Sequence, residues 1–160
     1  MEPVPLNDAV SEQKGARRGC RTQYAALPYR QRADGTVEVL LVTSRETERW
    51  VVPKGWPMKG RSPHASAARE ALEEAGLVGR VDKEPIGSYR YDKRLEGGKV
   101  VPCMVEVFPL EVKAQKKKWP EKGQRTIRWL LPEDAAEAVD EAGLSETIRN
   151  LQSRMRPEEL

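Results

Sequence analysis

The sequence predicts an α+β domain in which a mixed β-sheet lies between helices, an α/β/α sandwich. Short runs rich in β-branched residues occur on both sides of one amphipathic helix, and a second helical stretch closes the chain. Strands and helices do not alternate regularly, as a doubly wound parallel sheet would require. A layered domain with a mixed central sheet is therefore the better expectation.

The length of the chain predicts one domain. Its 160 residues are enough for a hydrophobic core and too few for two domains of ordinary size. Residues 1–18 are polar and lack apolar periodicity, so we expect a flexible N-terminal arm there. The domain is expected over 19–152, with a short flexible tail over 153–160.

Composition indicates a cytoplasmic protein with no membrane partner. No apolar run has the length needed to cross a bilayer, and the N-terminus lacks a signal-peptide core. Cys20 and Cys103 have no companions at the spacing of a zinc site, so free thiols are expected. A net charge of +3 permits attraction to phosphate groups but does not favour a dedicated nucleic-acid binder.

The elements before the helix follow from local composition. Residues 22–30 and 36–44 have strand composition and are separated by the turn sequence ADG at 33–35. A short apolar run over 49–55 is interrupted at Pro53, which cannot donate to a sheet.

The helix has signals at both of its ends. Ser62 is a suitable N-cap, Pro63 suits the first helical position, and Gly76 stands where a C-terminal glycine belongs. Two strands, a basic loop, another strand and a helical stretch are expected to follow, over 84–93, 100–112, 116–125, 126–131 and 132–152. A break in the last stretch is expected near Gly143.

Three glutamates of the predicted helix share one face. Residues three and four apart are neighbours on a helix, so Glu70, Glu73 and Glu74 form an acidic cluster. The opposite face is expected to pack on the sheet through Ala65, Ala68, Leu72 and Ala75. Carboxylates at these spacings repel one another, and a divalent cation offsets that repulsion. A solvated acidic face is the alternative when the helix is considered alone.

The segment from Gly55 to Leu77 resembles the Nudix box. That pattern is a glycine, five residues, a glutamate, seven residues and then Arg-Glu-apolar-x-Glu-Glu-x-Gly-apolar. Gly55 stands at the matching distance from Arg69, and REALEEAGL matches the second half. Flanking strands and a terminal helix extend the resemblance over about residues 20–152. It implies a Nudix-type sandwich and hydrolysis of a phosphoanhydride bond.

The resemblance also implies the roles of individual residues. Glu70, Glu73 and Glu74 would hold Mg2+ or Mn2+, and the backbone carbonyl of Gly55 would complete one coordination sphere. Glu74 would orient or deprotonate the attacking water, with Glu73 as the alternative. Arg69 would fix one of these carboxylates in place.

Two positions depart from the family pattern. Arg61 stands where the first glutamate of the box belongs, and Ala71 is smaller than the usual apolar residue. Because the family's metal ligands are mainly the helix glutamates, the resemblance does not require that the change at Arg61 abolish activity. The change removes a negative charge near the metals, which could lower the number or affinity of the bound ions.

Within the family, the chain is most similar to the diadenosine and diphosphoinositol polyphosphate hydrolases. The similarity lies in EVLLVTSRETERWVVPKGW before the box and GQRTIRWLLPEDA after it. It implies a polyphosphorylated small molecule as substrate and a monomer or homodimer. The expected phosphate-binding residues are Arg21, Arg45, Lys54, Lys122 and Arg125. Trp56 and Trp119, both in loops, are candidates to stack on an adenine ring.

Three other functions are consistent with the sequence. The chain could hydrolyse nucleotide sugars, oxidised nucleotides or the 5′-triphosphate of RNA, because no loop discriminates these substrates. It could be a catalytically silent nucleotide sensor, which only Arg61 supports. It could bind nucleic acid through its basic loop, although its basic residues are dispersed.

Overall fold

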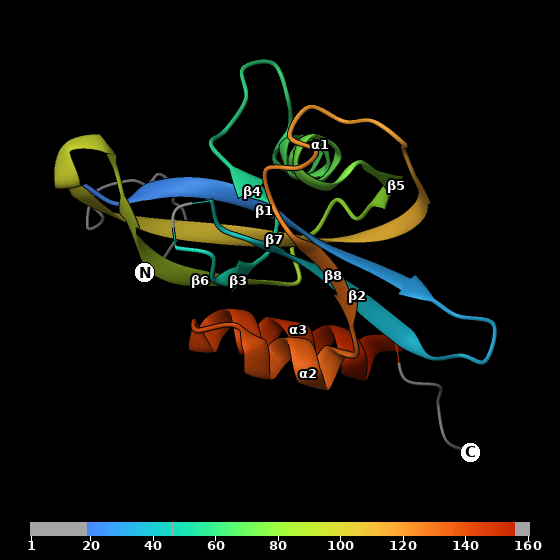
Figure 1. The fold of residues 1–160 in the computed structure, drawn as a ribbon. Helices are drawn as coiled ribbons and strands as arrows, with labels where there is room; N and C mark the ends of the chain where they lie inside the picture. The colour runs from blue at the N-terminus through green and yellow to red at the C-terminus, as the bar shows by residue number, and fades with distance from the viewer. Residues whose placement is uncertain (1–18, 46, 156–160) are drawn as a thin grey trace.

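One mixed β-sheet separates the helices into two layers (Figure 1). In the computed structural model, which describes residues 19–45 and 47–155, α1 (Pro63–Ala75) covers one face of the sheet. The other face is covered by α2 (Pro132–Ala138) and α3 (Ala142–Met155). The predicted α/β/α arrangement is therefore confirmed. The N-terminal arm predicted over 1–18 lies outside the described residues.

The sheet has eight strands, and its centre is a parallel pair. The strands are β1 (Arg21–Gln31), β2 (Val37–Thr43), β3 (Trp50–Val51), β4 (Lys54–Gly55), β5 (Leu77–Val81), β6 (Gly87–Arg94), β7 (Val100–Gln115) and β8 (Ile127–Leu130). β1 and β7 run parallel, while the other pairs are antiparallel. This pairing brings the β6–β7 hairpin to the same side of the molecule as β4.

Most predicted strands are confirmed, with three differences. Leu77–Val81 forms β5, which the sequence did not indicate, because it is a largely exposed edge strand that contains Gly79. β6 begins at Gly87 rather than at residue 84. The terminal helical stretch breaks at Val139, whose backbone is extended, and not at Gly143. Gly143 lies inside α3, where the absence of a Cβ lets the helix approach the side chain of Tyr89.

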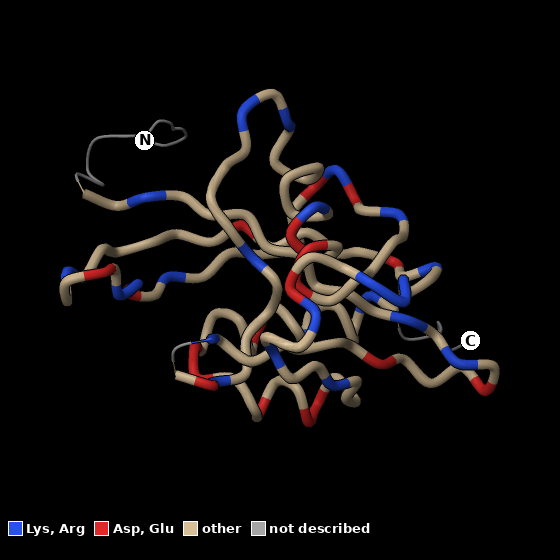
Figure 2. Tube along the Cα trace, turned by 45° about the horizontal axis from the view of Figure 1, so that its top comes forward, with Lys and Arg blue, Asp and Glu red and all other residues tan. Residues whose placement is uncertain are grey.

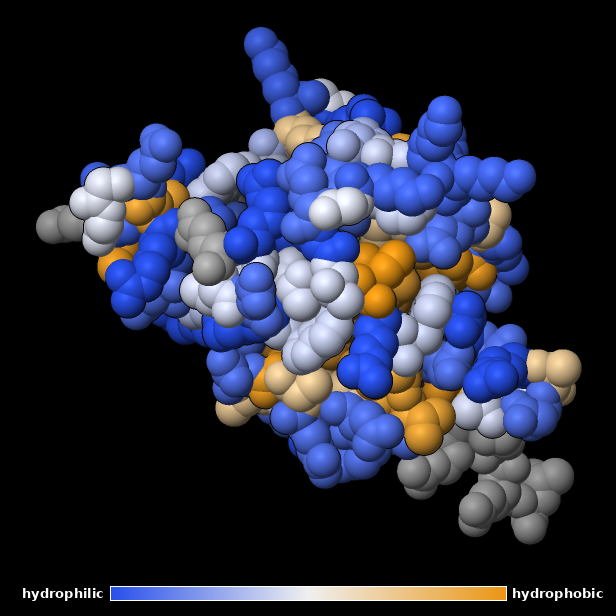
Figure 3. Space-filling model, in the orientation of Figure 1, coloured by the Kyte–Doolittle hydropathy of each residue, from blue (hydrophilic) through white to orange (hydrophobic). Residues whose placement is uncertain are grey.

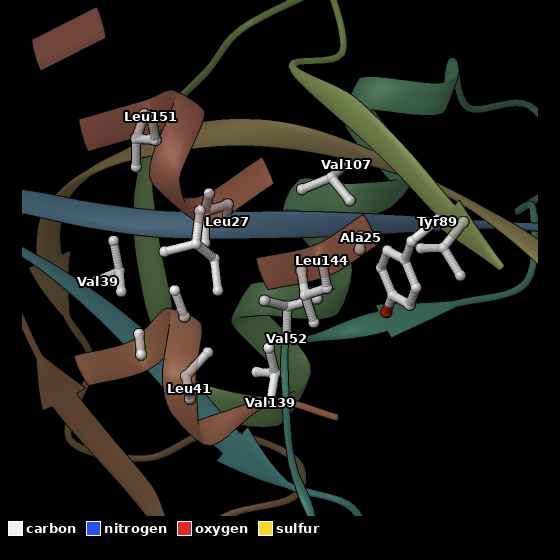
Figure 4. Packing of buried hydrophobic residues seen from close by; sticks show 14 residues of the cluster. Ala25, Leu27, Val39, Leu41, Val52, Tyr89, Val107, Val139, Leu144 and Leu151 are labelled. Carbon is white, nitrogen blue, oxygen red and sulfur yellow. The ribbon is translucent and has the colours of Figure 1, made fainter. Parts of the chain in front are cut away.

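Each face of the sheet carries its own hydrophobic cluster. The larger cluster fills the space under α2 and α3 and contains Leu27, Leu41, Val107, Leu144 and Leu151 (Figure 4). The smaller one lies under α1. Burying each such side chain contributes roughly 1.5–3 kcal/mol, so these clusters hold both helical layers on the sheet.

Helix α1 presents a different face to the sheet from the one expected. Ala67, Ala71 and Ala75, at steps of four, are fully buried, whereas Ala65, Ala68 and Leu72 are only partly buried. Three small residues in one row let the helix axis lie close to the strands. The small residue at 71 thus fits the packing, and the rotation of the helix carries Glu74 into the protein interior.

The surface is mainly hydrophilic on the side shown in Figure 3, where hydrophobic areas are small and separate. Among the described residues, the large apolar side chains that are exposed are Val78, Val100 and Leu131. No described helix combines the length and the hydropathy needed to span a membrane. α3 continues to Met155, past the predicted end of the domain at residue 152.

Candidate active site

Caps at both ends fix the helix that carries the acidic residues. The Ser62 side chain accepts a hydrogen bond from the backbone N–H of Ala65, as an N-cap does. Gly76 adopts a left-handed conformation with φ of 73° and donates its N–H to carbonyl groups of the last turn. The predicted caps are confirmed, and they set where each glutamate stands relative to the sheet.

Gly55 makes room for the carboxylate of Glu70. In β4, Gly55 pairs with Tyr24 of β1, and a Cβ at this position would collide with the Glu70 carboxylate. The side chain of Glu70 therefore lies directly against the strand backbone. Burial raises the pKa of Glu70, so its charged form lacks the stabilisation that water would give.

Glu74 is the most deeply buried acid of the helix, with an exposed fraction of 4%. Its Oε2 accepts a hydrogen bond from the backbone N–H of Lys54 at 3.4 Å, and its Oε1 lies 3.6 Å from Nε of Arg125. Burial raises the pKa of Glu74 to about 8 despite the attraction of Arg125. At neutral pH a carboxyl group with this pKa is largely protonated, and a nearby divalent cation would favour its charged form.

Lys54 and Tyr91 form the wall beside Glu74. The ammonium group of Lys54 lies 5.0 Å from the centre of the Tyr91 ring, and burial lowers the pKa of Lys54 to about 8. The Tyr91 hydroxyl donates to Oε1 of Gln23 at 2.5 Å. The wall therefore combines a cation with a fixed aromatic ring next to the buried acid.

Glu73 stands apart from the other two acids. Nε of Arg69 donates to Oε2 of Glu73 at 2.8 Å, and both side chains lie near the helix surface. Glu70 lies against β4 instead, and its negative charge adds to the effect of burial in raising the pKa of Glu74. Within the described part of the chain, no three His, Cys, Asp or Glu side chains are grouped as a ready metal site. The metal assignment stays a prediction.

A cavity of about 240 Å³ opens next to Glu74. Its wall carries six cationic side chains, Arg45, Arg49, Lys54, Lys93, Arg94 and Arg125. The acidic side chains in the wall are Glu74 and Asp92. Figure 2 shows the basic and acidic residues distributed along the whole described trace. An excess of fixed positive charge in a hollow attracts phosphate groups.

The structure brings three of the five expected phosphate-binding residues together. Arg45, Lys54 and Arg125 line the cavity, whereas Arg21 and Lys122 do not. The guanidinium of Arg21 stacks on Trp56, 4.1 Å from the ring centre. Lys122 donates to the carbonyl of Lys117 outside the cavity.

Sequence reasoning missed three cations of the cavity wall. Lys93 and Arg94 end β6, and they reach the cavity because β7 runs parallel to β1. That pairing joins residues far apart in the chain, and no local pattern marks it. Arg49 donates to Glu141 at 2.9 Å and to Asp140 at 3.2 Å, in the connection between α2 and α3. In the sequence, only the position of Arg49 directly before the WVVPKG run indicated that it could reach the cavity.

Comparison with known proteins agrees with the box and the fold. The model of the NUDIX domain matches residues 21–151. Nudix hydrolase 18, mitochondrial, of Arabidopsis thaliana is 31% identical over 144 residues, which cover 86% of this chain and 80% of that protein. Diphosphoinositol polyphosphate phosphohydrolase 2 of Rattus norvegicus is 38% identical over 68 residues, or 42% of this chain and 37% of that protein.

A solved structure shares the fold at lower sequence identity. The crystal structure of a C. elegans Ap4A hydrolase binary complex has a TM-score of 0.62 and 22% identity, and the match covers 84% of this chain and 97% of that chain. The cytoplasmic location expected from the sequence stays a prediction, since the Arabidopsis relative carries the word mitochondrial in its name. The box, the sandwich and the family model together establish that this chain belongs to the Nudix family of hydrolases, which act on pyrophosphate bonds with the help of divalent metal ions.

Proposed function

We propose that this Nudix hydrolase cleaves a phosphoanhydride bond in a polyphosphorylated small molecule, either a diadenosine polyphosphate or a diphosphoinositol polyphosphate. The observation that carries the proposal is the cavity in which six cationic side chains surround the buried Glu74. A single mononucleotide needs fewer cations than this wall supplies. The names of the rat relative and the nematode structure support the same substrate classes.

The buried acids fit a divalent cation. Glu70 and Glu74 are held side by side where burial disfavours two negative charges, and a cation relieves that cost. Gly55 supplies the space that keeps Glu70 against the strand. We assign Glu70, Glu73, Glu74 and the carbonyl of Gly55 to Mg2+ or Mn2+. When bound, such an ion neutralises phosphate charge and lowers the pKa of a coordinated water.

The other residues bind, orient and accept a proton. Arg45, Lys54 and Arg125 hold the phosphates of the substrate through charge-assisted hydrogen bonds. We assign to Glu74 the acceptance of a proton from the attacking water, because its carboxylate lies in the cavity wall and the resemblance to the box gives it that role. Arg69 restrains Glu73, which is the alternative base.

A substrate panel tests the proposal. Product release is measured with diadenosine tetra- to hexaphosphate, diphosphoinositol polyphosphate, a nucleotide sugar and triphosphate-capped RNA, each with Mg2+, with Mn2+ and with chelator. We expect metal-dependent cleavage of the first two classes to be fastest. Faster cleavage of the nucleotide sugar or the RNA would reject the substrate assignment. Binding of these compounds without any turnover would favour the sensor alternative.

Replacing Arg61 by glutamate restores the box and is expected to raise activity at low Mg2+. Arg61 is exposed at the start of α1, with its backbone N–H donated to the carbonyl of Met58. The resemblance to the Nudix box implies that a carboxylate at this position adds negative charge near the metals, so we expect stronger metal binding. Rates are compared across a Mg2+ titration, where the gain should vanish at saturation.

The matched control is Lys59→Glu, which makes the same change of charge on an exposed residue of the same loop. An equal gain in both variants would assign the effect to general surface charge rather than to the box position. No gain in Arg61→Glu would make the departure at 61 incidental to metal binding.

A further inference from the structure

The connection from β7 to β8, residues 116–125, packs against the C-terminal end of α1. The indole of Trp119 lies so close over Gly76 that a Cβ at this glycine would collide with it. The indole Nε1 is buried and has no hydrogen-bond partner among the described residues. Packing on Gly76, together with the ammonium group of Lys122 at 5.0 Å from the ring centre, therefore places Trp119.

Hydrogen bonds tie the last turn of the helix to the same connection and to the end of β7. They satisfy carbonyl groups that a helix leaves unpaired at its C-terminus. The bonds, with the donor first, run from Glu121 N to Glu73 O at 3.0 Å, from Lys116 N to Gly76 O at 2.8 Å and from Gln115 Nε2 to Ala75 O at 2.9 Å. The turn that carries Glu73 and Glu74 is therefore fixed by this connection.

Arg125 links the connection to the buried acid. Its Nε donates to Oε1 of Glu121 at 3.1 Å and lies 3.6 Å from Oε1 of Glu74. Its Nη1 donates to the carbonyl of Thr43 at 3.0 Å. The exposed fraction of the Arg125 side chain is 12%, so water competes little for the guanidinium. The side-chain oxygen of Glu121 and the carbonyl oxygen of Thr43 thus orient the guanidinium that lies next to Glu74.

We propose that Trp119 and Glu121 are positioning residues of the active site. Trp119 places residues 116–125 on Gly76, Glu121 orients Arg125, and Arg125 holds the Glu74 carboxylate beside Glu70. Partners of this kind, one contact removed from the reacting groups, are commonly worth about 10–100-fold in metal affinity or activity. This inference rests on the proposed function, because the group that is positioned is the proposed metal ligand and base.

Glu121→Ala tests whether Glu121 positions Glu74 through Arg125, and it alters no residue assigned to metal or substrate contact. Mn2+ affinity is measured by electron paramagnetic resonance without substrate, and kcat and KM are measured separately. We expect Mn2+ affinity and kcat to fall by about 10–100-fold. KM should rise less than kcat falls, because Arg45 and Lys54 keep their places in the cavity wall and only Arg125 loses its partner. Glu121→Gln keeps an oxygen that accepts from Arg125 and should recover part of both losses.

The control is Glu133→Ala. It removes an exposed ion pair, in which Oε2 of Glu133 lies 2.9 Å from Nη2 of Arg149, and should leave Mn2+ affinity and kcat unchanged. A second pair of variants tests the indole: Trp119→Phe keeps a ring over Gly76 and should retain Mn2+ affinity, whereas Trp119→Ala should not. Thermal unfolding of each variant confirms that folded protein is compared.

Two outcomes would overturn the inference. Equal Mn2+ affinity and kcat in folded Glu121→Ala and wild type would remove the positioning role while leaving the proposed function intact. Absence of Mn2+ and Mg2+ binding in the wild-type chain would reject the proposed function and the inference with it.

Discussion

Replacing Glu74 by glutamine is expected to reduce turnover by about 10²–10⁴-fold, the range found for loss of a general base. The amide has the shape of the carboxylate but accepts no proton at neutral pH and is a weak metal ligand. The amide keeps one oxygen, so either the Lys54 N–H or the Arg125 guanidinium still meets an acceptor while the other faces the amide NH2, and thermal unfolding is measured to compare folded proteins. Turnover is measured at saturating Mg2+ with the best substrate of the panel.

Two further variants serve as comparisons for the loss of turnover in Glu74→Gln. Glu137→Gln makes the same chemical change on an exposed residue of α2 and should retain wild-type turnover. Glu73→Gln tests the alternative base, which is paired with Arg69 near the helix surface. A larger loss in Glu73→Gln than in Glu74→Gln would transfer the proton-accepting role to Glu73. Near-normal turnover in both would refute the assignment of these acids.

The parts of the fold that the sequence predicts correctly are those determined by residues close together in the chain. The caps at Ser62 and Gly76 follow from side-chain chemistry and backbone conformation, which act within a few residues. The strand over 36–44 follows from its β-branched residues, and the strand over 22–30 from a mixed aromatic and aliphatic composition. β5 has no such signal because its pairing with β7 is set by the tertiary structure.

The orientation of α1 shows where pattern reasoning fails. Ala65, Ala68, Leu72 and Ala75 formed a plausible apolar stripe. Ala75 is fully buried as expected, but Ala67 and Ala71 are buried in place of the other three. On an alanine-rich helix, several faces have similar hydropathy, and close approach to the sheet decides among them. The consequence is functional, since the observed orientation buries Glu74 instead of leaving it on a solvated face.

The composition of the site was likewise only partly predictable. The box identified Glu70, Glu73, Glu74 and Gly55 because its spacing acts along one short segment. The cations at Lys93 and Arg94 depend on the parallel pairing of β1 with β7, a contact between distant segments. Arg125 was expected to meet phosphate, and its contact with Glu74 required the packing of residues 116–125 on α1.

Replacing Gly55 by alanine is expected to impair metal binding while leaving the fold stable. The backbone of Gly55 is not in the left-handed region, so alanine is compatible with its conformation. The new methyl group would meet only the Glu70 carboxylate, the mobile end of a flexible side chain. Glu70 would turn away from the strand, and we expect Mn2+ affinity and turnover to fall by about 10–100-fold. Isothermal titration with Mn2+ and thermal unfolding measure the two effects separately.

A double-mutant cycle decides whether this effect passes through Glu70. Alanine keeps the backbone carbonyl at 55, so loss of that ligand cannot explain the phenotype. In the background of Glu70→Ala, the methyl group has no carboxylate to displace, and Gly55→Ala should then cause no further loss of Mn2+ affinity or turnover. Additive losses in the double variant would mean that the methyl group acts on the β4 backbone or on the carbonyl it carries.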